Sequence, residues 1–226
     1  MEYGKPRRVS LEKLRAIQLK LAEKVVEEDC FDRLENICGL DVSYKEDKAV
    51  ACAVTVRFEG LRKIEAAFAS SKAYFPYIPT FLSFRETPIL MKAVRRLREK
   101  VDVFMVDANG VLHPYFLGAA SHLGVLLDKP TVGVTKKLLC GELLEPRRLE
   151  SGVTMAPIVV KGRIAGAAVS VRGLKPVYVS VGHKVSLETA VRLVVETLRN
   201  RMPEPIRLAH TLSRAYARGC QQTLRT

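Results

Sequence analysis

The spacing of apolar residues changes near residue 36. Residues 10–28 carry apolar side chains at steps of three and four, which predicts an amphipathic helix with one apolar stripe. Three β-rich stretches follow between residues 36 and 72, separated by the polar run 45–47 and by Gly60, and this pattern predicts an antiparallel meander. The expected helical stripe consists of Leu11, Leu14, Ile17, Leu21 and Val25.

The rest of the chain alternates between short apolar runs and helical patterns. Thr87 and Pro88 form an N-cap and N1 pair, which predicts a helix from there to about Lys100. The alternation predicts an α/β fold with a mixed central sheet flanked by helices, in one domain spanning residues 1–226. The other expected elements are strands at 101–107, 130–136 and 176–180, a helix at 118–128, a hairpin over 156–170 turning at Lys161-Gly162, and helices from Ser186 to about Asn200 and from Pro205 onward.

The net charge of +13 and the isoelectric point near 9.7 favour contact with polyanions, because excess Lys and Arg attract phosphate backbones. The charge alone does not distinguish a nucleic-acid-binding protein from a basic protein that is merely soluble. No apolar run approaches the roughly 20 residues that span a bilayer, and the start MEYGKPRRVS lacks an apolar signal-peptide core. We therefore expect a soluble, cytoplasmic protein with no membrane partner.

The cysteines carry no recognisable site. Their odd number argues against a closed disulfide framework, and they form neither a CxxC pair nor a zinc-binding spacing. We assign no role to Cys30, Cys38, Cys52, Cys140 and Cys220.

Three carboxylates could carry chemistry. Asp41 interrupts a strand, Asp107 ends an apolar strand, and Glu86 precedes the expected helix start. Each has an ordinary alternative: a surface-facing strand residue, an Asx turn and a helix-dipole contact, respectively. Together they can converge on Mg²⁺, which prefers oxygen ligands, and the order of strands and helices is that of the ribonuclease H-like layout.

Two basic residues and one loop complete the set of candidates. Lys136 follows an apolar strand and can stabilise charge on a phosphoryl group, although it can equally be a solvated lysine. His210 can lie beside a metal ion or ligate it, or it can be structural. The wedge segment, Pro76, Tyr77, Ile78 and Pro79, holds its shape through two prolines and can enter a base stack, or it can pack Tyr77 on the core.

Seven short blocks, in order from about residue 36 to 210, resemble the endonuclease V family. Each block alone is weak, but the ordered set is specific. The blocks are GLDVSY (39–44), PYIPTFLSFRE (76–86), VDANGVLHP (106–114), GAASHLGV (118–125), PTVGVTKKL (130–138), PVYVSVGHKVSLE (176–188) and PEPIRLAH (203–210).

The resemblance implies a ribonuclease H-like fold and hydrolysis that depends on Mg²⁺, with Mn²⁺ as a substitute. The implied substrate is DNA containing deoxyinosine, nicked at the second phosphodiester bond on the 3′ side, with 3′-hydroxyl and 5′-phosphate ends. A monomer is expected. The residues that match the family's catalytic positions are Asp41, Glu86, Asp107, Lys136 and His210, of which the three carboxylates are the implied metal ligands.

The resemblance also implies a pocket for the altered base near Leu82, Gly110 and Gly118, where small residues let the backbone approach the base edge. Two positions depart from the family pattern: Ala108 and Val181 replace a usual glycine and a usual proline. Two other functions remain open, an endonuclease for inosine-containing RNA and a nucleic-acid-binding protein without catalysis.

Overall fold

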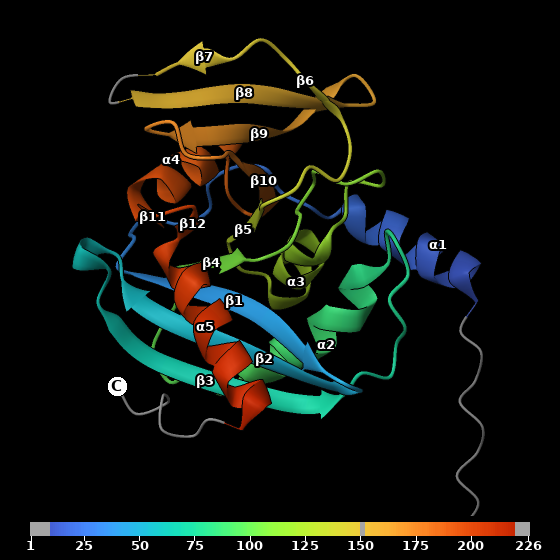
Figure 1. The fold of residues 1–226 in the computed structure, drawn as a ribbon. Helices are drawn as coiled ribbons and strands as arrows, with labels where there is room; N and C mark the ends of the chain where they lie inside the picture. Colours follow the sequence, from blue (N-terminus) through green and yellow to red (C-terminus); the bar gives the residue numbers. More distant parts are fainter. Residues whose placement is uncertain (1–9, 150–151, 220–226) are drawn as a thin grey trace, which may run out of the picture.

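Ten strands form one continuous sheet in the computed structural model, which describes residues 10–149 and 152–219 (Figure 1). The strand order is β3-β2-β1-β4-β5-β10-β9-β8-β6, and β7 also pairs with β8. The strands are β1 (Asn36–Lys45), β2 (Lys48–Arg57), β3 (Lys63–Lys72), β4 (Val103–Val106), β5 (Thr131–Thr135), β6 (Glu142–Leu143), β7 (Arg147–Arg148), β8 (Val153–Val160), β9 (Arg163–Val171) and β10 (Val177–His183). A separate ribbon pairs β11 (Leu198–Arg199) with β12 (Met202–Pro203).

Helices cover both faces of the sheet. The helix α5 crosses β1 and β2 on one face, where α4 covers β9 and β10, while α2 and α3 pack on the other face (Figure 1). The helices are α1 (Leu11–Ala22), η1 (Glu59–Leu61), α2 (Leu82–Val94), α3 (Ala119–Leu127), α4 (Leu187–Thr197) and α5 (Glu204–Arg218). The predicted mixed α/β fold is confirmed.

The sheet changes from antiparallel to parallel where the candidate carboxylates lie. The predicted meander β1-β2-β3 is confirmed as antiparallel, whereas β4 pairs in parallel with both β1 and β5. Side chains of a strand alternate between faces, so Gly39 and Asp41 share the face covered by α5. A Cβ at Gly39 would lie 2.1 Å from the backbone of Pro205, so only glycine lets the start of α5 come this close to β1.

The first helix is shorter than predicted, and its buried face is different. The helix ends at Ala22 instead of near residue 28, and Leu11 and Ile17 are each 46% exposed. Leu14 is buried as expected, but the other buried residue of the helix is the polar Gln18. The prediction was wrong because it scored apolar periodicity, whereas Gln18 is buried through hydrogen bonds to distant backbone carbonyls.

The second helix begins six residues before the predicted start. Thr87 and Pro88 do not open it, because α2 starts at Leu82 and Pro88 lies inside it. The first turn buries Ser83 and the second buries Glu86. Burial of the segment before Pro88 therefore outweighs the one backbone hydrogen bond that proline cannot donate.

The C-terminal half follows the prediction closely. Lys161 and Gly162 have positive φ at the tip of the β8–β9 hairpin, as predicted. Ser186 caps α4 by accepting a hydrogen bond from the Thr189 amide at 3.1 Å, and α5 starts at Glu204, one residue from the expected position. The four described cysteines are free thiols, while Cys220 and the start of the chain lie outside the described residues.

In the part of the chain that the structure describes, no helix is both long and apolar enough to cross a membrane.

Candidate active site

A possible cation site lies where β1, β4 and α5 meet. Asp41, Asp107 and His210 each offer one ligand atom, and these atoms lie within 4.8 Å of one another. The adjacent parallel strands carry the two carboxylates, and the Asp107 amide donates to the Leu40 carbonyl at 3.0 Å. Two carboxylates and an imidazole form a donor set suited to a divalent cation such as Mg²⁺ or Mn²⁺.

Two serines hold Asp41 in place. The Ser213 hydroxyl donates to Asp41 Oδ2 at 2.5 Å, and Ser43 Oγ lies 2.6 Å from Ser213 Oγ. His210 Nδ1 lies 3.3 Å from the same carboxylate oxygen, and this contact raises the pKa of His210. Ser43 Oγ also donates to Asp41 Oδ2 at 3.4 Å, so the contacts that Asp41 receives from these three residues all involve Oδ2, and among the described residues Oδ1 stays available to a cation.

Asp107, the second carboxylate of this group, has a pKa that is raised toward neutral pH. The pKa of Asp107 is raised to about 6, mainly by burial and also by the charge of Asp41, whereas Lys136 and His210 act in the opposite direction. Lys136 is exposed and lies just after β5. Its ammonium is close enough to Asp107 to lower the pKa of that carboxyl group. Two like charges side by side repel each other, and a bound cation would relieve this repulsion.

Glu86 lies apart from this group, on α2. The Tyr44 hydroxyl donates to Glu86 Oε1 at 3.2 Å, and the Arg85 guanidinium lies 4.4 Å from the centre of the Tyr44 ring. The pKa of Glu86 is raised to about 8, mainly by burial, with smaller contributions from the charges of Asp41 and Asp107. Glu86 is therefore close enough to sense both carboxylates, although it is not within the 4.8 Å group.

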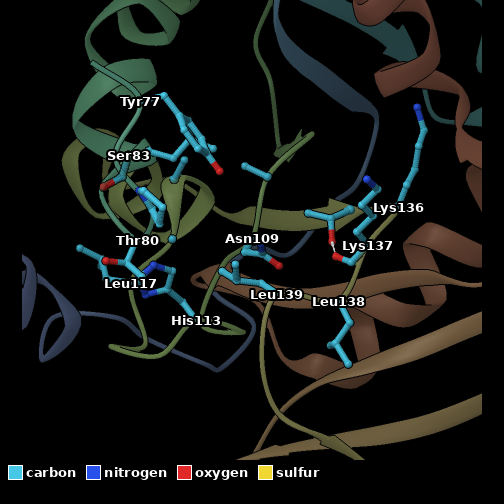
Figure 2. A pocket seen from close by; sticks show the side chains of 16 residues that line it. Tyr77, Thr80, Ser83, Asn109, His113, Leu117, Lys136, Lys137, Leu138 and Leu139 are labelled. Carbon is cyan, nitrogen blue, oxygen red and sulfur yellow. Dashed lines mark hydrogen bonds between the residues drawn. The ribbon is translucent and has the colours of Figure 1, made fainter. Parts of the chain in front are cut away.

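A cavity of about 460 Å³ opens beside these residues. Figure 2 shows Tyr77 on one side of it, Lys136 and Lys137 on the other, and Asn109 between them. Leu82 and Gly118, two of the three residues expected at the base pocket, line this cavity. Gly110 does not, because a Cβ there would lie 1.9 Å from the Val181 carbonyl oxygen, behind the cavity wall.

The wedge segment stands out from the surface. Tyr77 is 68% exposed, so the alternative in which it packs on the core is wrong. Pro76 and Pro79 are exposed as well, and Tyr77 and Pro79 both line the cavity. An aromatic side chain is thus held at the cavity mouth, free to contact another molecule.

Two residues that line the cavity carry buried polar atoms without partners. Ser83 Oγ and Asn109 Oδ1 are buried, and neither has a hydrogen-bond partner among the described residues. His113 also lines the cavity, and burial lowers its pKa to about 4, which keeps the imidazole neutral at neutral pH. Buried polar groups normally find partners, so the cavity is suited to a ligand with its own donors and acceptors.

The sequence patterns missed several of these residues. Ser213 follows His210 by three positions, a helical spacing that puts both on one face of α5 and was a usable signal. Tyr44, Ser83 and Asn109 gave no signal of their own in the sequence. At the departure from the family pattern, Ala108 does not have a positive φ, so alanine causes no backbone strain there.

Comparison with known proteins gives one consistent family. The family model described as Endonuclease V matches residues 19–211. A curated relative named Endonuclease V, from Thermofilum pendens, is 46% identical over 218 residues, covering 95% of this chain and 92% of its own.

Solved structures agree in fold. The catalytic domain of human Endonuclease V is 35% identical with a TM-score of 0.86, and the match covers 97% of this chain and 100% of that one. Ciona intestinalis Endonuclease V, solved with a 24mer DNA containing an inosine followed by a ribo-adenosine, is 27% identical with a TM-score of 0.81 and coverage of 93% and 99%. These likenesses bear out the expected ribonuclease H-like fold.

Proposed function

Because the chain belongs to the endonuclease V family, we propose that it is a DNA repair endonuclease acting on deoxyinosine. It nicks the second phosphodiester bond on the 3′ side of the lesion by metal-dependent hydrolysis, and it leaves 3′-hydroxyl and 5′-phosphate ends. We assign this activity to one catalytic domain. The observation that carries the proposal is the convergence of Asp41, Asp107 and His210 beside a cavity with Tyr77 at its mouth.

The residues divide into a group that handles the phosphate and a group that handles the base. Asp41 and Asp107 would hold Mg²⁺, or Mn²⁺ in its place, with Glu86 as the third acidic residue. A bound cation supplies charge neutralisation at the scissile phosphate and its leaving oxygen, and it promotes ionisation of the attacking water. Lys136 lies close enough to Asp107 to lower its pKa, and a phosphate bound beside Asp107 would be near the same ammonium. Lys136 then stabilises the negative charge that develops on the phosphoryl group.

His210 has a distinct role in proton handling. Its imidazole lies 3.3 Å from Asp41, which raises its pKa and so keeps a proton available between these two groups near neutral pH. The Ser213 hydroxyl orients the same carboxylate oxygen. We propose that His210 orients or exchanges a proton with the attacking water while Ser213 and Ser43 keep Asp41 in position.

The wedge segment and the cavity would handle the base. Tyr77 enters the base stack as a rigid apolar group, and the cavity beside Leu82 and Gly118 receives the base. Asn109 Oδ1 is an acceptor that suits the N1–H of hypoxanthine, whereas adenine has an acceptor at this position. Gly110 lies behind the cavity wall, where the absence of a side chain allows its backbone to pack closely on β10.

A nicking assay tests the proposal. The substrates are a labelled duplex with one deoxyinosine and an undamaged duplex, each with Mg²⁺ and with EDTA. We expect a metal-dependent nick one nucleotide beyond the lesion on its 3′ side, and no nick in the undamaged duplex. Asp107→Ala should abolish cleavage and retain binding, because removal of a carboxylate lessens repulsion of phosphate; cleavage by this variant at the wild-type rate would refute the metal assignment.

An inosine-containing RNA forms the second arm of the assay. The Ciona relative was solved with a strand in which a ribo-adenosine follows the inosine, so a ribose on the 3′ side of the lesion is accommodated in that protein. Cleavage of RNA but not of DNA would show that inosine-containing RNA is the substrate. Metal-independent binding of both without cleavage would mark it as a binding protein.

A further inference from the structure

A strained turn joins the wedge segment to α2. The Phe81 amide donates to the Ile78 carbonyl at 3.0 Å, with Pro79 and Thr80 as the two central residues. Thr80 has a φ of 68°. A proline followed by a residue of positive φ is the arrangement of a type II turn, whose third position favours glycine. A β-branched residue is unfavourable there, so other contacts must hold Thr80 in this conformation.

The helix α1 provides these contacts. Gln18 is fully buried, and its Nε2 donates to the Thr80 carbonyl at 3.0 Å and to the Leu117 carbonyl at 2.8 Å. Arg15 Nη2 donates to Thr80 Oγ1 at 2.8 Å. Leu117 lies directly before Gly118, so Gln18 ties together two walls of the cavity, the turn and the start of α3.

Arg15 is itself fixed in place. Its guanidinium lies 4.2 Å from the centre of the Phe81 ring and 3.3 Å from that of Tyr115, so it is stacked between two rings. Its Nη1 also donates to Gln18 Oε1. A planar guanidinium with donors in fixed directions suits this double stacking and hydrogen bonding, and lysine could not reproduce it.

The turn is a joint between two rigid parts. Pro76 and Pro79 have fixed φ angles, so the wedge segment holds its own shape. On the other side of Thr80, α2 is packed into the core. Arg85 on α2 also donates to the Phe75 carbonyl at 2.6 Å, which holds the first end of the wedge segment, and the backbone at Thr80 sets the orientation of its second end.

We propose that Arg15 and Gln18 are positioning residues, which hold Thr80 in its strained conformation and thereby keep Tyr77 at the mouth of the cavity. The functional part of this inference rests on the proposed deoxyinosine-directed cleavage. Without the brace from α1, Thr80 relaxes to a negative φ and turns the wedge segment away. The contribution of α1 is thus specific to a threonine, because glycine at this position adopts a positive φ without help.

A double-mutant cycle tests the brace without any substrate. The four proteins are the wild type, Arg15→Met, Thr80→Gly and the double variant, measured by hydrogen exchange of the amides in residues 77–82. We expect exchange about tenfold faster in Arg15→Met than in wild type, and a change of at most about twofold when the same substitution is made in Thr80→Gly. Equal effects in both backgrounds, or no effect in either, would overturn the proposal.

The same four proteins are then compared in single-turnover nicking of a deoxyinosine duplex. Arg15→Met should lower the rate about tenfold, and Thr80→Gly should restore most of it in the double variant. Lys13→Met is the matched control, because it removes the same charge from an exposed position of α1 and should leave the rate unchanged. An equal loss in Lys13→Met would mean that Arg15 acts only through charge. If the wild type does not nick the duplex, the proposed function fails, while the exchange cycle still decides the brace.

Discussion

Binding of a divalent cation should release protons from the two perturbed carboxyl groups. Without a metal ion, Asp107 has a pKa of about 6 and Glu86 a pKa of about 8. A cation favours ionised ligands, so its affinity rises with pH through this range and each ligand that ionises on binding releases its proton. The number of protons released therefore reports which carboxyl groups take part.

The expected number at pH 7 follows from these values. Asp107 is largely ionised already and contributes about 0.1 proton, whereas Glu86 is largely protonated and contributes about 0.9. If Glu86 ionises when the cation binds, about one proton is released, and the logarithm of the affinity rises by about one for each pH unit. If Glu86 stays protonated as a hydrogen-bond donor, the release is only about 0.1 proton.

Calorimetric titration with Mn²⁺ at pH 7, in buffers that differ in ionisation enthalpy, measures the proton release directly. The control is Glu86→Gln, which keeps the shape of the side chain and removes its titration. We expect about one proton for wild type and about 0.1 for the variant. A wild-type value near 0.1 would refute the assignment of Glu86 as an acidic ligand and leave Asp41 and Asp107 as the ligands of the cation.

Three further outcomes are expected. Tyr77→Ala should slow nicking of duplex at least about tenfold more than nicking of single-stranded deoxyinosine DNA, since only the duplex requires unstacking; equal losses would contradict the wedge role. Burial lowers the pKa of His122 to about 4, below 6.5 in the unfolded chain, so stability is lost as pH falls through this window. The loss approaches about 3 kcal/mol, and denaturant unfolding should show a shallower pH dependence in His122→Gln. DNA binding should weaken by about a decade or more over a few-fold rise in salt, and a flat response in a filter-binding titration would exclude the basic surface as the DNA face.

The parts of the fold that the sequence predicted well are those with local signals. The meander from residue 36 to 72 follows from three β-rich stretches separated by turn residues, and its register puts Asp41 beside β4. Asp107 could be placed because a buried strand that ends in a carboxylate brings it to an edge where parallel strands meet. The convergence of Asp41 and Asp107 was thus predictable from position along two strands.

The parts that the sequence did not predict depend on contacts between distant segments. Gln18 is buried because carbonyls 62 and 99 positions away accept its hydrogen bonds, and no periodicity in α1 contains that information. The start of α2 was misplaced because Thr87-Pro88 is a strong local helix-start signal, whereas burial of Ser83 and Glu86 decides the matter. In both cases a tertiary contact overrides a local preference.

Recognition of the base and binding of the metal ion should be separable, although Tyr77 and Glu86 lie on one short segment. Glu86 is fixed by α2, whose residues Ile89, Leu90 and Ala93 are all buried in the core. The wedge segment precedes this helix and is joined to it through Thr80. Because core packing holds α2 independently of α1, Arg15→Met should slow nicking of the deoxyinosine duplex and leave the proton release on Mn²⁺ binding at the wild-type value. A variant that loses both would show instead that α2 moves with the turn, and that a single rigid unit carries the wedge and the third carboxylate.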